Sequence, residues 1–227
     1  MTPPVQEEHV EQAAIDLFRS LGWAAANVMD ETFGERGTLG REHKGEVVLM
    51  QRLRAALAKL NPGLPASGVD QAIEALTRDR SALTLVAANR EVYGLVQNGV
   101  KVRVPGSNDD DDDEDRTVRV IDWDQPARND FFVAQQLWVQ GQIYQRRADL
   151  VGFVNGLPLV FIELKGIDHN VEEGFRNNFR DYLDTIPQLF WFNAAVIFSN
   201  GLESRLGTIT GQWANFKEWK RIEREEE

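Results

Sequence analysis

The clearest hydrophobic pattern in the chain is a pair of apolar runs, residues 150–154 and 157–162, with Asn155-Gly156 between them. An Asn-Gly pair between two apolar runs is a strong signal for a tight β-hairpin turn. Charged residues stand only where the two runs join the rest of the chain. The pattern therefore predicts an apolar hairpin with ionisable groups at its open end.

The remaining hydrophobic positions predict a mixture of helices and strands. Apolar residues recur at helical spacing in a segment that begins near Thr2-Pro3 and ends at Gly22, and again in later segments. The predicted helices are residues 3–21, 47–60, 67–76, 83–96 and 172–183, with a packed C-terminal helix at 213–219. The predicted strands are residues 101–104, 118–121, 129–141, 143–148, 194–199 and 206–210, and residues 27–43 are expected to form a loop. These elements predict an α/β domain in which a mixed central sheet is flanked by helices.

Three ionisable residues stand at the open end of the predicted hairpin. Asp149 opens the first strand, and Glu163 and Lys165 close the second, two positions apart and therefore on one face. Burying charges beside apolar strands is costly unless the charges have partners. Two carboxylates suggest a shared cation, and oxygen ligands suit Mg²⁺ or, alternatively, Mn²⁺. With a lysine beside them, these groups are typical of metal-assisted phosphodiester hydrolysis.

The register of the hairpin tests this metal site. With a two-residue loop, Asp149 pairs with Ile162 and points away from Glu163. A three-residue loop that includes Val154 places Asp149 and Glu163 on one face, within reach of one ion. We therefore expect the odd loop or a β-bulge with the same effect. An even loop without a bulge argues against a metal site.

Composition limits the class of protein. The chain has 227 residues, 42% of them hydrophobic, which is enough for one domain with a sizeable core. No apolar run approaches the roughly 20 residues of a membrane helix, and no signal peptide is visible. The absence of cysteine excludes disulfides and thiolate metal sites, and it fits a cytoplasmic protein.

Charge argues against strong binding of DNA by this chain alone. The net charge is −11, and Asp109 to Asp115 is an unbroken run of seven acids. We interpret this run as a solvated, disordered hairpin tip. Basic and acidic residues balance in the C-terminal part, so no basic patch is strong enough to hold DNA by counter-ion release. If the chain cuts DNA, another part of a larger protein is expected to deliver the substrate.

The residues around the hairpin resemble a known family. The spacing D-x(13)-E-x-K is similar to that of PD-(D/E)xK nucleases, and the string FVNGLPLVFIELK, preceded by RRAD, is far more specific. It resembles the N-terminal nuclease domain of the R (motor) subunit of type I restriction enzymes. The similarity extends over nearly the whole chain. It implies a restriction-endonuclease-like fold and one nuclease domain, residues 1–227, with an N-terminal portion at 1–126 and a catalytic core at 127–220.

The resemblance also implies partners and cofactors. The chain would be a fragment of a larger motor protein, acting on double-stranded DNA beside the modification (methyltransferase) and specificity subunits of an ATP-dependent type I restriction-modification complex. No Walker-type GxxxxGK[ST] occurs in the sequence, so ATP is expected only in the missing motor domains. The enzyme class implied is a type I site-specific deoxyribonuclease that requires Mg²⁺.

The family assigns catalytic roles to the hairpin residues. Asp149 and Glu163 are expected to bind Mg²⁺ with the carbonyl of Leu164. Lys165 is expected to orient or help deprotonate the attacking water, or to neutralise developing charge. Glu11 matches an acid of the first helix that often faces the active site in the family, as an outer ligand of the metal or its water. From the sequence alone, Glu11 is equally interpretable as a solvated helix acid.

Other residues are candidates for positioning DNA. The family carries a Gln four residues before a Tyr, and here Asn178 and Tyr182 hold these places, although Tyr182 also suits a packed aromatic. Arg176 and Arg180 lie four apart on one helix face and can contact phosphate. Arg147, next to Asp149, can contact phosphate or pair with nearby acids.

Two alternatives to an enzyme remain open. One is a catalytically silent nuclease-like module that binds DNA or docks another subunit, because a fold does not fix a function. The other is a structural salt bridge of Lys165 with Glu163 or Asp149.

Overall fold

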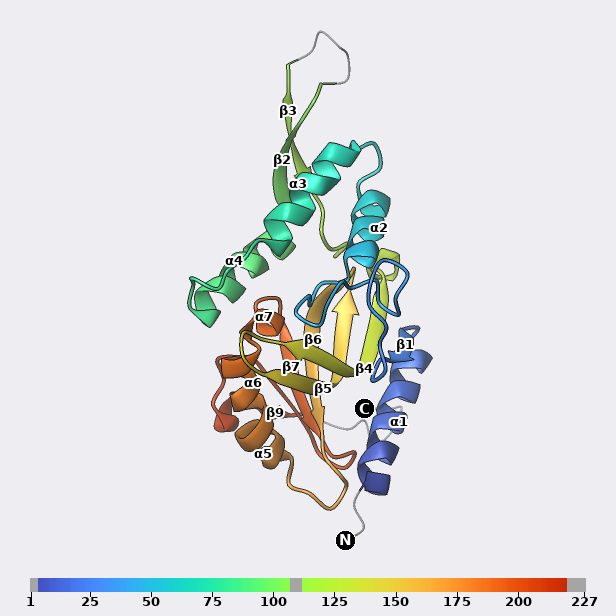
Figure 1. The fold of residues 1–227 in the computed structure, drawn as a ribbon, viewed down its shortest axis with the longest axis vertical. Helices are drawn as coiled ribbons and strands as arrows, with labels where there is room; N and C mark the ends of the chain where they lie inside the picture. Colours follow the sequence, from blue (N-terminus) through green and yellow to red (C-terminus); the bar gives the residue numbers. More distant parts are fainter. Residues whose placement is uncertain (1–3, 107–111, 220–227) are drawn as a thin grey trace.

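The protein folds around a mixed seven-stranded sheet with helices on both faces, as the sequence predicts (Figure 1). The computed structural model describes residues 4–106 and 112–219, and the side chains of the first helix from residue 7 on. The strand order is β1-β4-β5-β6-β7-β8-β9. The β1–β4 and β6–β7 pairs are parallel, and the other neighbours are antiparallel. The strands of this sheet are β1 (Ala24–Asn27), β4 (Phe131–Gln140), β5 (Gln145–Val154), β6 (Leu157–Leu164), β7 (Ala195–Ser199), β8 (Ser204–Gly207) and β9 (Lys217–Glu218).

Two helical layers cover the sheet. Helix α1 (Pro4–Ser20) packs Ile15 against Val133, Leu150 and Ile162 on one face. The other face carries an aromatic cluster from α5 (Val171–Glu173), the π-helical turn η2 (Gly174–Phe179), α6 (Arg180–Thr185) and α7 (Pro187–Phe190). Its core is formed by the stacked and edge-on rings of Phe161, Phe175, Phe179, Phe190, Phe198 and Phe216. The hairpin β5–β6 is therefore buried on both sides.

A helical lobe extends from one end of the sheet. It contains α2 (Met50–Leu60), α3 (Ala66–Thr77), α4 (Leu85–Asn98) and the two-stranded sheet of β2 (Val100–Val104) and β3 (Glu114–Val118). Figure 1 shows α3 lying along β2, far from α5 and α6. Among the described residues, the lobe contributes none to the acid cluster of Glu7, Glu11 and Asp149.

The central hairpin has an even loop and a bulge. Val154 pairs with Leu157 across Asn155 and Gly156, which both have positive φ (52° and 80°), so the expected odd loop is wrong. Beyond Phe153–Pro158 the register shifts by one residue, and Leu159 is left out of the pairing. The expected bulge is therefore confirmed. Continuing the shifted register from Leu150–Ile162 places Asp149 opposite Glu163.

Several sequence predictions of secondary structure are wrong at their ends. Helix α2 begins at Met50 rather than residue 47, because the N–H of Leu49 bonds to the carbonyl of Gly156 on the hairpin turn (2.9 Å) and keeps this segment extended. Strand β3 ends at Val118, whereas the prediction began there. Glu114 and Asp115, predicted as loop, belong to β3 because they pair with β2.

The C-terminal prediction is also wrong. Residues 213–219 form a 3₁₀ turn (Trp213–Asn215) and the short strand β9 instead of a helix. Trp213 and Phe216 stack with ring centroids 5.9 Å apart. The spacing of three residues between these aromatic side chains therefore belongs to a tight turn and not to a helix. Strand β8 likewise begins at Ser204 rather than 206. The predicted cap at Thr2-Pro3 and residues 109–111 of the acidic run lie outside the described residues.

Candidate functional site

The three hairpin residues meet at the open end of β5–β6, as predicted. Asp149 is 8% exposed and Glu163 1% exposed, so both carboxylates are buried. The backbone N–H of Leu164 donates to Asp149 Oδ2 (2.7 Å). Lys165 Nζ donates to Glu163 Oε1 (2.8 Å), and the same oxygen accepts from the Asn178 amide. The salt bridge that the sequence left open thus exists between Lys165 and Glu163.

Helix α1 brings two more carboxylates to this end of the sheet. Oxygens of Glu7, Glu11 and Asp149 lie within 4.8 Å of one another. Glu11 is buried, and each of its oxygens accepts an amide N–H, from Gln135 and from Gln136, both at 2.7 Å. Glu11 is therefore a fixed member of the site rather than a solvated helix acid.

An irregularity in β4 supports this arrangement. Gln136 has φ 61°, a left-handed conformation that non-glycine residues rarely adopt, and it is missing from the pairing with β5. Its neighbours Gln135 and Leu137 pair normally. The distortion lets adjacent glutamines reach the same carboxylate, and such strained positions are often found at functional sites.

Burial raises the pKa of both hairpin acids. Burial, followed by the charge of Glu163, raises the pKa of Asp149 to about 8. Burial also raises the pKa of Glu163, although Lys165 opposes this effect. Burial alone would lower the pKa of Lys165, but the attraction of Glu163 outweighs it and raises the pKa. At neutral pH the lysine is therefore a cation.

The donor set fits a divalent cation. Glu163 Oε2 is buried without a hydrogen-bond partner. Among the described residues, no lysine or arginine forms an ion pair with Glu7, Glu11 or Asp149, although ion pairs are common elsewhere in the fold. Carboxylate oxygens grouped without a basic partner are what Mg²⁺ or Mn²⁺ prefers. The salt bridge with Lys165 gives Glu163 Oε1 a basic partner, but it provides none for Glu7, Glu11 or Asp149.

The π-helical turn η2 packs closely against Glu163 at Gly174. A Cβ at Gly174 would lie 3.0 Å from Glu163 Cγ and 3.2 Å from the Phe198 ring, closer than side chains usually pack, so glycine favours the close approach of this turn. The same turn carries Asn178 onto the carboxylate. π-Helical turns are rare and are frequently found at functional sites.

The residues predicted to position DNA separate into two groups. The Tyr182 hydroxyl donates to the carbonyl of Arg147 (3.0 Å), and burial raises the pKa of Tyr182, so this tyrosine is a packed support for β5. Arg176 is paired with Glu172 (2.5 Å), so part of its charge is balanced. Arg147 and Arg180 are exposed, and among the described residues neither guanidinium has an ion pair.

Sequence reasoning missed Glu7, Gln135 and the role of Gln136 in holding Glu11. Glu7 stands four residues before Glu11 in α1, the spacing that puts two side chains on one helix face. That spacing was a usable signal, but two acids on a helix more often form a solvated face.

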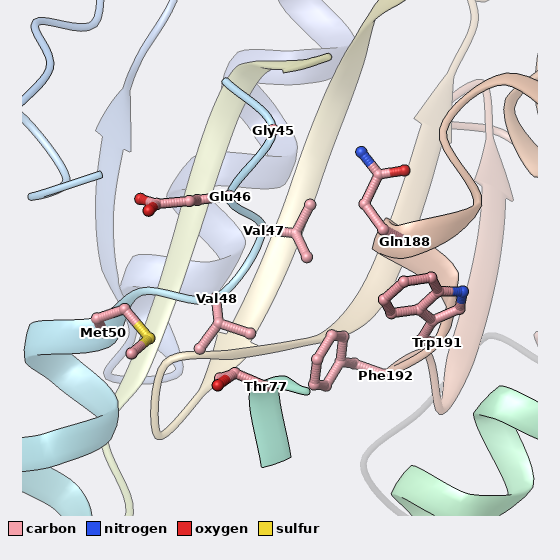
Figure 2. A pocket seen from close by; sticks show the side chains of 9 residues that line it. All are labelled: Gly45, Glu46, Val47, Val48, Met50, Thr77, Gln188, Trp191 and Phe192. Atoms are coloured by element: carbon pink, nitrogen blue, oxygen red, sulfur yellow. The ribbon is translucent and has the colours of Figure 1, made fainter. Parts of the chain in front are cut away.

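One pocket of the protein, of about 330 Å³, has none of the four site carboxylates in its lining. It is lined by Gly45, Glu46, Val47, Val48, Met50, Thr77, Gln188, Trp191 and Phe192. In Figure 2, Val47 and Val48 point toward Trp191 and Phe192, so its walls are largely apolar. The acid site lies at the open end of the β5–β6 hairpin. Among the helices that the structure describes, none is long and apolar enough to cross a membrane.

Comparison with known proteins identifies the family of this chain. Residues 4–215 match the family model of the type I restriction enzyme R protein N terminus. The chain is 34% identical to the type I restriction enzyme HindI endonuclease subunit of Haemophilus influenzae, over 96% of this chain and 21% of that protein. It is 28% identical to the putative type I restriction enzyme MjaIXP endonuclease subunit of Methanocaldococcus jannaschii, again over 96% of this chain and 21% of that protein. The chain thus spans about a fifth of the length of these relatives. It belongs to the family of type I restriction enzyme R protein N termini.

Proposed function

We propose that this chain is a Mg²⁺-dependent endonuclease domain that hydrolyses phosphodiester bonds of duplex DNA. The observation that carries the proposal is the group of three carboxylates, the half-buried Glu7 and the buried Glu11 and Asp149, which have no basic partner among the described residues. A buried oxygen of Glu163 without a hydrogen-bond partner adds to it. The family membership and the names of the relatives, which are endonuclease subunits, support the same reaction.

Four carboxylates can hold the metal. Asp149 is central, because it lies close to both α1 acids and, by register, opposite Glu163. Glu11 is held by its two amides, and the carbonyl of Leu164 is a further candidate ligand. When bound, Mg²⁺ supplies Lewis-acid polarisation of the phosphate and stabilises charge on the leaving oxygen.

Lys165 has a defined part in the hydrolysis. The oxygen of the attacking water bonds to phosphorus, the bond from phosphorus to the bridging oxygen breaks, and the leaving oxygen takes a proton. In the metal-free protein the pKa of Lys165 is raised, which favours the ammonium form near neutral pH. Its role is to orient the water and balance charge on the phosphate, while a site carboxylate removes the water proton.

The larger assembly follows from the family. We propose that the chain is the cutting part of an ATP-dependent type I restriction complex in the cytoplasm, with modification and specificity subunits as partners. Motor domains outside this chain would use ATP. Arg147 and Arg180 are the candidate phosphate contacts, and Arg176 can join them if its pair with Glu172 opens. Asn178 positions Glu163, and Tyr182 positions β5.

A silent docking module is the second candidate. The net charge of −11 favours it, because duplex DNA repels an acidic chain. The two candidates differ in the ion: the enzyme needs Mg²⁺ or Mn²⁺ at Asp149, and a docking module does not.

The test is Mn²⁺ binding by calorimetry together with nicking of supercoiled plasmid. Wild type should bind Mn²⁺ and nick the plasmid, Asp149→Ala should lose both, and Lys165→Ala should lose nicking alone. Asp184→Ala, an exposed acid of α6, is the matched control and should behave as wild type. Weak binding by the run at 109–115 would persist in every variant. Equal Mn²⁺ binding by wild type and Asp149→Ala would overturn the proposal.

A further inference from the structure

A cluster of aromatic and basic side chains lies beside the acid site. Beyond the irregularity at Gln136, β4 and β5 continue as a hairpin in which Trp138 pairs with Arg147. The guanidinium of Arg147 lies 5.6 Å from the centroid of the Trp138 ring, and the ammonium of Lys44 lies 5.1 Å from it. The two cations repel each other, and the attraction of each cation to the face of the indole ring opposes this repulsion.

Neither cation is balanced by a carboxylate. Among the described residues, Arg147 makes no ion pair, and Lys44 donates only to the neutral amide oxygen of Gln145 (3.1 Å). The neighbouring Arg146, in contrast, forms a two-point ion pair with Asp181. In a chain of net charge −11, two cations that share one aromatic ring and form no ion pair indicate a binding site for an anion.

The cluster is fixed in position before any ligand arrives. The carbonyl of Lys44 accepts the N–H of Gln140 on β4 (3.0 Å). The carbonyl of Arg147 accepts the hydroxyl of Tyr182 (3.0 Å). Because both segments are held by their backbones, little backbone order is lost when an anion binds, which favours affinity.

The distance to the acid site matches a nucleic acid backbone. Arg147 precedes Asp149 by two residues in β5, about 7 Å along the strand. This separation is short enough for one DNA strand to contact both places. Resting on the proposed nuclease function, we propose that Lys44, Trp138 and Arg147 grip the phosphate backbone close to the bond that is cut. Lys44 and Arg147 contact phosphate, and Trp138 is a positioning residue that holds them.

Binding of a fluorescent 30-base-pair duplex without metal tests this grip. All variants are made in an Asp149→Asn background, so that cleavage cannot interfere. The binding result can therefore be interpreted even if the nuclease proposal fails. Lys44→Gln and Arg147→Gln should each weaken binding by about three- to tenfold and lower the salt slope of log K by about one. Arg54→Gln, which removes an arginine paired with Asp70 in the helical lobe, is the matched control and should bind as the parent does.

Substitution of the ring separates positioning from direct contact. Trp138→Leu should weaken binding but keep the salt slope, because both charges remain, and Trp138→Phe should restore most of the affinity through its own ring. Thermal melting of each variant checks its fold. Unchanged affinity and slope in Arg147→Gln, or a parent that binds no duplex, would overturn this inference, whether or not wild type cuts DNA.

Discussion

A carboxylate buried beside another carboxylate keeps its proton, and Asp149 does so at the centre of the site. Its ordinary pKa is 3.8, and in the fold it is about 8. The folded chain therefore holds a proton that the unfolded chain releases between these values. Folding stability without metal falls as pH rises through this window, because the folded state must either keep the proton or bury the charge.

Replacing Asp149 should relieve this cost. Asp149→Asn keeps an oxygen for the Leu164 N–H and carries no charge. We expect the metal-free variant to be more stable than wild type at pH 8 by about 2–4 kcal/mol, with the difference shrinking toward pH 4. Thermal or denaturant unfolding at several pH values measures it. Parallel pH profiles for wild type and variant would contradict the expectation, and Mg²⁺ should stabilise wild type alone.

For single residues, the sequence predicted the group of ionisable side chains on the hairpin but not the contacts that neighbouring elements make with that group. Asp149, Glu163 and Lys165 could be grouped because strand geometry has a period of two. The pairing of Glu11 with Gln135 and Gln136 depends on a left-handed residue in β4, and no local pattern signals that conformation.

Among the elements, the turn of the central hairpin carries an unusual share of the polar contacts. Asn155 is fully buried, and its amide accepts the Asp130 N–H (2.7 Å) and donates to Val120 O and Asn129 Oδ1 (both 2.8 Å). The turn therefore ties the hairpin to the segment between β3 and β4.

Two substitutions separate these bonds from backbone conformation. Asn155→Gly keeps the positive φ but loses the side-chain bonds, and should reduce the free energy of unfolding by about 2–4 kcal/mol. Asn155→Ala loses the bonds and adds strain, and should cost about 1 kcal/mol more. Urea titration measures both. Equal stability of Ala and Gly variants would show that strain at this turn is negligible.

The elements that the sequence missed depend on distant partners. Strand β1 reads Ala-Ala-Ala-Asn, a weak strand former, and it is extended because it pairs with β4. The C-terminal aromatics fit a helix by spacing alone, but the ring cluster around Phe198 holds them in a turn. The bulge was predicted only as the condition for a metal site.

In the whole molecule, Asn89 is one of the side chains that link the helical lobe to the core. Asn89 of α4 donates to the carbonyls of Phe190 (3.2 Å), Trp191 (3.1 Å) and Asn193 (2.8 Å). These carbonyls lie at and beyond the end of α7. Because the lobe holds no site residue, the link should affect stability rather than chemistry.

Asn89→Ala tests this separation. The variant should lose about 1–3 kcal/mol of stability, because buried carbonyls lose their donor, and hydrogen exchange should rise in α4 and α7. Mn²⁺ affinity should stay at the wild-type value. A parallel loss of Mn²⁺ affinity would show that the lobe and the site are coupled.

The hydrogen bond between Glu11 and Gln136 joins residues that are 125 positions apart, so it can form only after Gln136 has been synthesised. Glu11 leaves the ribosome early, but Asp149, Glu163 and Lys165 follow well past the middle of this chain. At roughly 5–20 residues per second, the interval is about 8–30 s. During that interval the nascent chain lacks part of the proposed metal site. Under the proposed function, a polypeptide that stops before residue 163 lacks Glu163 and Lys165 and is therefore expected not to cut DNA.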